Sequence, residues 1–245
     1  MSWPIFVISL VDAQDRRDFI RKQCAAFGLD FEIIDAIDGR DGLPPELESK
    51  IDRVGAQAYM GRLMTDAEFA CALSHQLAYE RIVKNNLPGA IVLEDDAILT
   101  EAFADFIHSE GYLVADFIQM DHRNARHWPW KKKYRFRQIG LQQLAQNAGL
   151  ATAYSLSNHA AQFVLSQSQP LKGHADWPCD MTPLRPLVAV PRLATQPPLD
   201  VIQSTLEAGR LQSISEHRKQ NRRGRFVTAD YWRRWLRKRL TKAIP

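Results

Sequence analysis

Three consecutive acids, Glu94, Asp95 and Asp96, have the residue types and spacing best suited to chemistry in this chain. They follow an apolar run, residues 89–93, that predicts a buried strand because no polar residue alternates within it. Open α/β sheets bind ligands at the carboxyl ends of their strands, which is where these acids would lie. Adjacent carboxylates repel one another unless they spread into solvent or a cation neutralises them. Two interpretations follow: a solvated acidic turn, or a site where Mg²⁺ or Mn²⁺ binds carboxylates together with substrate phosphates.

The segments around this strand alternate between strand and helix patterns. Residues 4–11 and 31–35 predict buried strands, and the residues between them show helical spacing that ends before Gly28. Thr65 and Glu68 form a capping-box pattern that predicts the start of a further helix, with His75 in its middle. Strand, helix and strand in succession predict a parallel pair of strands. The chain is therefore expected to form an α/β fold.

Composition and cysteine spacing exclude some classes of protein. A chain of 245 residues with 45% hydrophobic content can bury one large or two small domains. The three cysteines are widely separated and form no Cys-x-x-Cys pair, so neither a disulfide framework nor a thiolate metal site is predicted. No apolar stretch approaches the roughly 18 residues of a membrane span, and we expect a cytoplasmic protein.

Basic residues are concentrated at the C-terminus. The net charge is +4, but residues 217–245 hold eleven Lys and Arg against a single acid, Asp230. Residues 228–243 predict a helix with Trp and Leu on one side and Arg and Lys on the other. This pattern is typical of an interfacial anchor attracted to anionic lipid, and packing against the protein's own core is the alternative. We expect residues 219–245 to form a membrane-associating tail on the inner face of the cytoplasmic membrane, after a domain formed by residues 1–218.

Residues 122–137 mix basic and aromatic side chains. Such a mixture is found in single-stranded nucleic-acid binders, and it also suits a lid that stacks on sugars and contacts phosphates. A solvated loop with a hairpin is the simplest alternative. A nucleic-acid-binding module built on this tract and the tail is therefore the second hypothesis for function, and a metal-dependent phosphohydrolase is the third.

Several blocks of the sequence together resemble glycosyltransferase family 25, which comprises bacterial lipooligosaccharide galactosyltransferases and animal collagen galactosyltransferase domains. The blocks are residues 6–10 with 15–17, 35–39, 65–75, 92–96 and 176–177. The resemblance covers about residues 4–218. It implies a GT-A-like, Rossmann-like fold with a mostly parallel central sheet, UDP-galactose as the usual donor, and inversion at the anomeric carbon. The acceptor would be a lipid-linked oligosaccharide, and no nucleic acid is expected as a partner.

The resemblance also implies roles for individual residues. Asp96 is the first choice as a ligand of Mn²⁺ (or Mg²⁺), with Glu94 beside it, and the cation would stabilise the departing UDP. Asp176 is the expected catalytic base, with Trp177 next to it to stack on a sugar, and Asp180 is the second choice. The expected donor contacts are Ser9, Leu10, Arg16, Asp35, Ala36, Ile37, His75, Glu94 and Asp95. For Arg16 a surface ion pair, and for His75 a purely packed role, remain open alternatives.

Overall fold

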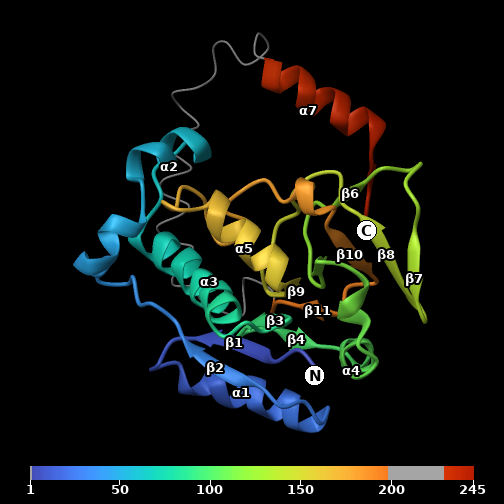
Figure 1. Ribbon diagram of the computed structural model, residues 1–245, viewed down its shortest axis with the longest axis horizontal. Helices are drawn as coiled ribbons and strands as arrows, with labels where there is room; N and C mark the ends of the chain where they lie inside the picture. Colours follow the sequence, from blue (N-terminus) through green and yellow to red (C-terminus); the bar gives the residue numbers. More distant parts are fainter. Residues whose placement is uncertain (1, 198–228) are drawn as a thin grey trace.

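The computed structural model describes residues 2–197 and 229–245, and every structural statement below concerns these residues (Figure 1). At the centre is an eight-stranded sheet in the order β2-β1-β3-β9-β5-β10-β8-β7. In chain order its strands are β1 (Ile5–Ser9), β2 (Glu32–Asp35), β3 (Gly89–Glu94), β5 (Phe117–Gln119), β7 (Tyr134–Phe136), β8 (Ile139–Gln143), β9 (Ala153–Ser157) and β10 (Leu187–Val190).

The strands run mostly in one direction. The pairs β1/β2, β1/β3 and β5/β10 are parallel, so β1, β2 and β3 end at the same edge of the sheet. β9 is antiparallel to both of its neighbours, β3 and β5, and β8 is antiparallel to both β10 and β7. Only β9 and β8 therefore oppose the other strands of this sheet. The expected α/β fold with a mostly parallel, Rossmann-like sheet is confirmed, with the difference that β9 interrupts the parallel order beside β3.

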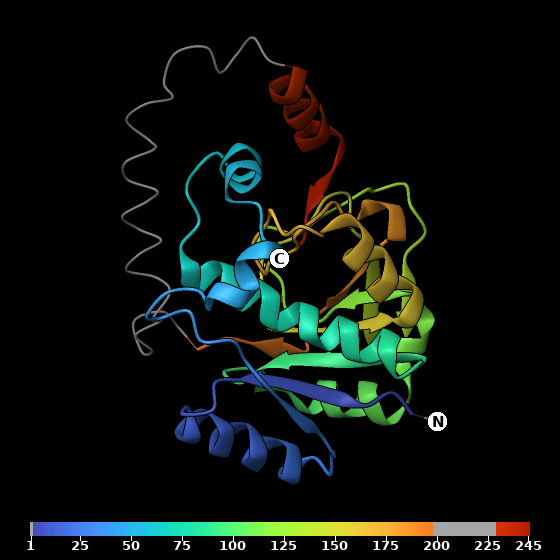
Figure 2. The same cartoon turned by 60° about the vertical axis from the view of Figure 1, so that its left-hand side comes forward.

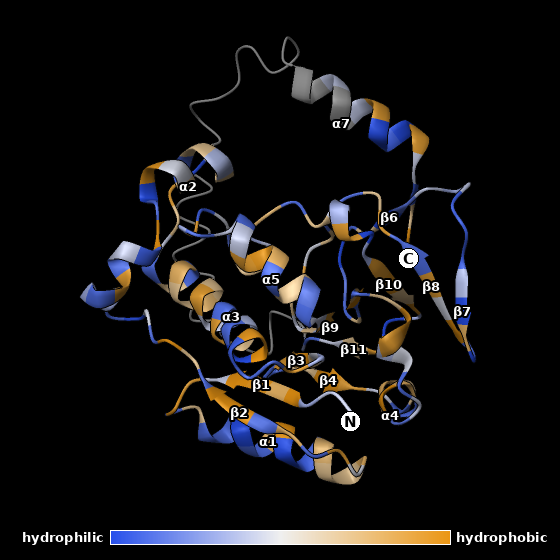
Figure 3. Cartoon of the chain, viewed as in Figure 1, coloured by the Kyte–Doolittle hydropathy of each residue, from blue (hydrophilic) through white to orange (hydrophobic). Residues whose placement is uncertain are grey.

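Helices cover both faces of the sheet (Figure 2). On one face, α1 (Gln14–Ala26) and α4 (Glu101–His108) pack on Ile5 and Val7 of β1. On the other face, α3 (Asp66–Lys84) and α5 (Asn158–Gln167) pack on Phe6 and Ile8. Successive strand residues point to opposite faces, so a strand buried on both faces must be apolar throughout. Figure 3 shows this as continuous hydrophobic colour along β1.

Helix α3 begins where the capping box predicts. The Thr65 hydroxyl accepts from the Glu68 amide, and the Glu68 carboxylate accepts from the Thr65 amide. Glu68 also forms a buried ion pair with Arg62, 2.5 Å between Nη2 and Oε1. These contacts stabilise the first turn of the helix. They therefore set which residues of α3 face the ends of β1 and β3.

Shorter elements complete the fold. Two small sheets pair β11 (Ala194–Thr195) with β4 (Ile98–Leu99) and β12 (Lys242–Ala243) with β6 (Arg126–His127). The remaining described elements are the helices α2 (Arg53–Met60) and α7 (Ala229–Leu240) and the 3₁₀ helices η1 (Pro45–Lys50), η2 (Gly111–Val114) and η3 (Thr182–Leu184). The tract 122–137 thus contributes β6 and the strand β7, which forms the expected hairpin with β8.

The C-terminal residues return to the domain after α7. β12 pairs with β6, and Ile244 is buried with Ala125, Leu144 and Val188. The Arg126 guanidinium donates to the backbone oxygens of Lys238 and Thr241. The end of the expected tail is therefore attached to the domain, whereas the expected boundary at 218/219 lies outside the described residues. Within the two described ranges, the helices are all too short or too polar to cross a bilayer.

Candidate functional site

A cleft of about 420 Å³ opens at the edge where β1, β2 and β3 end. The loops after these three strands form one wall, and one side of α3 forms another. The loop that holds residues 174–176, together with Arg123, Leu150 and Gln196, completes the lining. Most of the residues proposed from the sequence meet here, namely Ser9, Leu10, Arg16, Ala36, Ile37, His75, Glu94, Asp95, Asp96 and Asp176.

Two of the proposed residues do not line the cleft. Asp35 ends β2 with its side chain 66% exposed, and it pairs with Arg17. Asp180 is exposed on a loop, where its carboxylate accepts from the amide and hydroxyl of Thr182. Asp35 therefore ties strand ends together through Arg17, and Asp180 caps a turn.

Among the three acids, Asp95 already has protein partners. Its Oδ2 accepts from the Ser9 hydroxyl at 2.7 Å, and its Oδ1 lies 3.2 Å from the Arg16 guanidinium. The Asp95 side chain is 9% exposed and the Arg16 side chain is 38% exposed. Asp95 thus holds the ends of β1 and β3 together. Arg16 keeps enough exposure for its guanidinium to reach an anion in the cleft.

Glu94 lies at the end of a buried chain of polar side chains. Its Oε1 is 3.3 Å from His75 Nε2, and its Oε2 accepts from the Gln196 amide at 2.9 Å. On the far side of the ring, His75 Nδ1 is 2.8 Å from the Tyr154 hydroxyl, which is 2.9 Å from the Tyr79 hydroxyl. The two rings of His75 and Tyr154 are also stacked. Both carboxylate oxygens of Glu94 are therefore oriented by neighbouring side chains.

Asp96 is the one acid of the three with an unsatisfied oxygen. Its Oδ1 is enclosed and has no hydrogen-bond partner among the described residues. Burial and the nearby charge of Glu94 raise the pKa of Asp96 to about 7. A cation would compensate both the missing partner and the repulsion. The carboxylates present thus fit an oxygen-preferring divalent ion, with Asp96 as the residue that most needs one.

A second group of possible metal ligands has a different chemistry. Cys71, His75 and Glu94 each offer one ligand atom, and these atoms all lie within 4.8 Å of one another. Cysteine spacing along the sequence argued against a thiolate site, because no second cysteine is near. The relevant spacing is instead the i, i+4 spacing of Cys71 and His75, which places them one turn apart on α3.

The structure places Asp176 and Trp177 in different surroundings. Asp176 is half-buried at the cleft, where a side chain added at Gly149 would contact both its carboxylate and Arg123. Trp177 is 3% exposed, packs edge-on against Phe117 at 4.7 Å, and donates its indole N–H to the Ala148 oxygen. The expectation that Trp177 stacks on a sugar is wrong. Its ring packs in the hydrophobic core instead.

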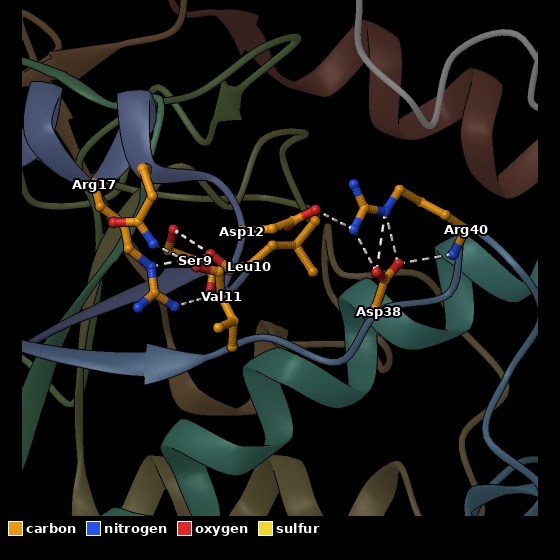
Figure 4. A network of polar contacts seen from close by, with 8 residues as sticks. Ser9, Leu10, Val11, Asp12, Arg17, Asp38 and Arg40 are labelled. Atoms are coloured by element: carbon orange, nitrogen blue, oxygen red, sulfur yellow. Dashed lines mark hydrogen bonds and ion pairs between the residues drawn. The ribbon is translucent and has the colours of Figure 1, made fainter.

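Arginines near the strand ends form two small networks (Figure 4). Arg17, whose side chain is 11% exposed, donates to the backbone oxygens of Ser9 and Leu10 and to Asp35. Arg40 donates to both Asp12 and Asp38. Arg17 therefore fixes the backbone after β1 against the end of β2. Arg40 holds the loop after β2 over the loop after β1, at the rim of the cleft.

Arg123 and His174 also line the cleft, and the sequence analysis did not identify them as site residues. A signal for Arg123 was present, because it closely follows β5, which runs in the same direction as β1. His174 lies two residues before Asp176, and the same loop places both residues at the cleft. Together with Arg16 and Arg40, Arg123 offsets part of the negative charge of the carboxylates that line this cleft.

Comparison with known proteins reveals clear sequence relatives. The model of the family described as glycosyltransferase family 25 (LPS biosynthesis protein) matches residues 2–182. Lipooligosaccharide biosynthesis protein lic2B of Haemophilus influenzae is 29% identical over 116 residues, 47% of this chain and 42% of the relative. Procollagen galactosyltransferase 1-B of Xenopus laevis is 33% identical over 95 residues, 38% of this chain and 16% of the relative.

A third relative covers more of this chain. "Probable inactive glycosyltransferase 25 family member 3" of Bos taurus is 30% identical over 188 residues, 69% of this chain and 29% of the relative. Each match thus spans less than half of the curated relative. Among solved structures, A197 from STIV superimposes with a TM-score of 0.39 and 9% identity over 77% of this chain and 81% of that chain. A TM-score this low supports no conclusion about the fold of this chain.

Proposed function

This chain belongs to glycosyltransferase family 25, and we propose that it transfers galactose from UDP-galactose to a lipooligosaccharide or lipopolysaccharide acceptor with inversion. The observation that carries the proposal is the convergence of Asp96, Arg16 and Asp176 in one cleft at the ends of β1 and β3. A nucleotide-sugar transferase needs a place for the nucleotide, positive charge for the diphosphate, and a base for the acceptor hydroxyl. The cleft offers residues for each. Nothing in the fold or the comparisons favours the nucleic-acid alternative.

The nucleotide is assigned to the wall formed by the strand ends. Ser9 and Leu10 follow β1, and Ala36 and Ile37 follow β2, so their backbone groups line the cleft side by side. Arg17 and Arg40 hold these two loops in place. A preformed wall of this kind binds a nucleotide without having to order a loop first. Galactose is proposed as the transferred sugar because the Xenopus relative is a procollagen galactosyltransferase.

Asp96 is proposed to hold a Mn²⁺ or Mg²⁺ ion, with Glu94 second. When bound, such an ion neutralises the donor diphosphate and stabilises the departing UDP. Asp95 keeps its hydrogen bond to Ser9, so it positions the loop rather than binding the ion. The Arg16 guanidinium supplies positive charge on the same side of the cleft.

Asp176 is proposed as the base that accepts the proton of the acceptor hydroxyl. It is the carboxylate on the loop of residues 174–176, at the wall of the cleft formed with Arg123 and Leu150. Inversion requires the acceptor oxygen to attack the anomeric carbon as UDP leaves from the other side, through an oxocarbenium-like state. A base within hydrogen-bond reach of that hydroxyl lowers the barrier for the attack.

The acceptor is proposed to be lipid-linked and to be reached at an anionic membrane surface on the inner face of the cytoplasmic membrane. The support is α7, on which Trp232, Trp235, Leu236 and Leu240 are 39–56% exposed. Its last turn carries Arg237, Lys238 and Arg239, and Figure 3 shows both hydrophobic and hydrophilic colour along the coloured part of α7. Exposed Trp and Leu beside Lys and Arg suit a helix lying in a headgroup layer.

A thermal-shift titration with UDP and Mn²⁺, followed by a nucleotide-sugar transfer assay, tests the proposal. We expect the melting temperature to rise only when UDP and the metal are both present, since each completes the other's site. Transfer to a truncated lipooligosaccharide should then be fastest with UDP-galactose. If the protein binds UDP and Mn²⁺ but transfers no sugar to any of a set of truncated lipooligosaccharides, the proposal is rejected.

A further inference from the structure

Three ligand atoms of different chemistry meet where α3 faces the end of β3. They are the Cys71 thiol, the His75 imidazole and the Glu94 carboxylate, all within 4.8 Å of one another. Cys71 and His75 lie one turn apart on the same side of α3, and Glu94 is the last residue of β3. All three residues line the cleft, so a cation held by them would be accessible from it.

The spacing of these atoms is close to that of a tetrahedral zinc site. With zinc bonds of about 2.0 Å to nitrogen and oxygen and about 2.3 Å to sulfur, the ligand atoms of a tetrahedral site with one thiolate are about 3.3 to 3.5 Å apart. His75 Nε2 and Glu94 Oε1 are already 3.3 Å apart. Because no separation in the group exceeds 4.8 Å, a shift of at most about 1.3 Å in Cys71 Sγ completes the spacing, which a χ1 rotation of some tens of degrees supplies.

The outer partners that a zinc site needs are also in place. Metal-bound histidines donate their other ring N–H to a neighbour that fixes the ring. Here His75 Nδ1 lies 2.8 Å from the Tyr154 hydroxyl, and that hydroxyl also forms a hydrogen bond of 2.9 Å with the Tyr79 hydroxyl. Gln196 donates to Glu94 Oε2, which leaves Oε1 turned toward His75.

The Tyr154 hydroxyl allows the same atoms to serve with and without a cation. Without one, His75 Nε2–H donates to Glu94, and Nδ1 accepts from the Tyr154 hydroxyl. With a cation at Nε2, the proton resides on Nδ1 and is donated to the Tyr154 oxygen instead. A phenol can donate or accept, so this change of tautomer requires no movement of the buried ring.

We propose that Cys71, His75 and Glu94 form a Zn²⁺ site with its fourth coordination position open to the cleft. A thiolate, an imidazole and a carboxylate suit zinc, whereas Mn²⁺ and Mg²⁺ prefer oxygen ligands. The site therefore differs in metal preference from the Asp96 carboxylate, although Glu94 could belong to both. Three protein ligands with an open fourth position are the pattern of zinc sites that exchange a water or a ligand group. The inference goes beyond sugar transfer, because zinc binding here requires neither donor nor acceptor.

Cobalt titration of the reduced, full-length protein tests this site, because Co²⁺ replaces Zn²⁺ and reports thiolate ligation by its colour. We expect one Co²⁺ to bind with a thiolate-to-cobalt charge-transfer band in the near ultraviolet, and Zn²⁺ to displace it. Cys71→Ser should abolish the band and weaken zinc binding by about tenfold or more in competition with a chromophoric chelator. Cys179 is a free cysteine outside the cleft lining, so Cys179→Ser is the matched control. This variant should keep both the charge-transfer band and the zinc affinity.

Two results overturn the proposal. One is that the unmodified protein binds Co²⁺ without a thiolate band, or fails to bind it. The other is that Cys71→Ser and Cys179→Ser bind zinc equally well. Should Cys71→Ser fail to fold, Glu94→Gln gives an independent measurement: zinc binding should weaken about tenfold while the thiolate band persists, and unchanged affinity contradicts the site.

Discussion

The carboxylate of Asp176 lines the cleft, whereas the indole of the next residue, Trp177, is buried in the core beneath it. The Trp177 backbone adopts φ = 83°, a left-handed conformation that is unusual for a bulky residue. The indole is held by the Ala148 oxygen and by the rings of Phe117 and Tyr154. Trp177 thus anchors the loop that presents Asp176.

Replacing Asp176 tests its proposed role as the base. Asp176→Asn keeps the shape of the side chain but cannot accept the proton, so we expect the turnover rate to fall by about a hundredfold or more. Asp180→Asn is the matched control, because Asp180 is exposed on the same loop region and caps Thr182. It should retain nearly full turnover in the same transfer assay. Equal losses in the two variants would remove Asp176 from the reaction.

Replacing Trp177 tests its proposed role as an anchor. Trp177→Phe keeps an aromatic ring but loses the hydrogen bond to Ala148, so we expect the free energy of unfolding to fall by about 1 to 3 kcal/mol. Turnover should fall with little change in the KM for UDP-galactose, because the donor wall is elsewhere. Trp130→Phe, at a side chain 62% exposed, should change stability by less than about 0.5 kcal/mol. Urea denaturation measures both variants, and equal stability of the two would contradict the anchoring role.

The raised pKa of Asp96 predicts a pH-dependent stability in metal-free buffer. The folded state shifts this pKa from 3.8 to about 7, so it binds the proton more tightly than the unfolded state does. Stability contributed by this group is therefore present below pH 4 and is lost as the pH rises to 7. Asp96→Asn removes that loss.

We expect Asp96→Asn to match the unmodified protein in stability at pH 4, and to exceed it by about 4 kcal/mol at pH 8. Denaturation with a chelator present measures this difference. The same variant should lose the joint stabilisation by UDP and Mn²⁺. A variant that is less stable at pH 8 would show that the Asp96 charge is already compensated within the protein.

The exposed face of α7 predicts binding to anionic vesicles. Deleting the helix is a poor test, because β12 and the buried Ile244 follow it and attach to the domain. Changing both Leu236 and Leu240 to Ser removes apolar surface only, and should reduce vesicle binding by about tenfold with unchanged melting temperature. Changing Leu113 and Val114 to Ser removes a comparable exposed pair on η2 and should leave binding intact. Co-sedimentation with phosphatidylglycerol vesicles distinguishes them, and equal binding by both variants rejects α7 as the contact.

Local patterns in the sequence anticipated a large part of this fold. The apolar runs in β1 and β3 are buried on both faces, and the Thr65 and Glu68 capping box begins α3 as predicted. The position of the acids after β3 was also predicted correctly, because they line the cleft where β1 and β3 end. The antiparallel placement of β9 was not predictable in the same way, because pairing with β3 and β5 depends on which edges meet after folding.

The sequence by itself determined which elements form and which residues reach the strand ends, because backbone periodicity and capping depend on near neighbours. Only the tertiary structure decided what each side chain does there. Gln196 and His75 reach Glu94 from distant parts of the chain, Ser9 and Arg16 satisfy Asp95, and Asp96 Oδ1 is left without a hydrogen-bond partner among the described residues. The burial of Trp177 and the meeting of Cys71 with His75 and Glu94 have the same origin. Partner choice and desolvation are set by groups that folding brings together, and no local pattern encodes them.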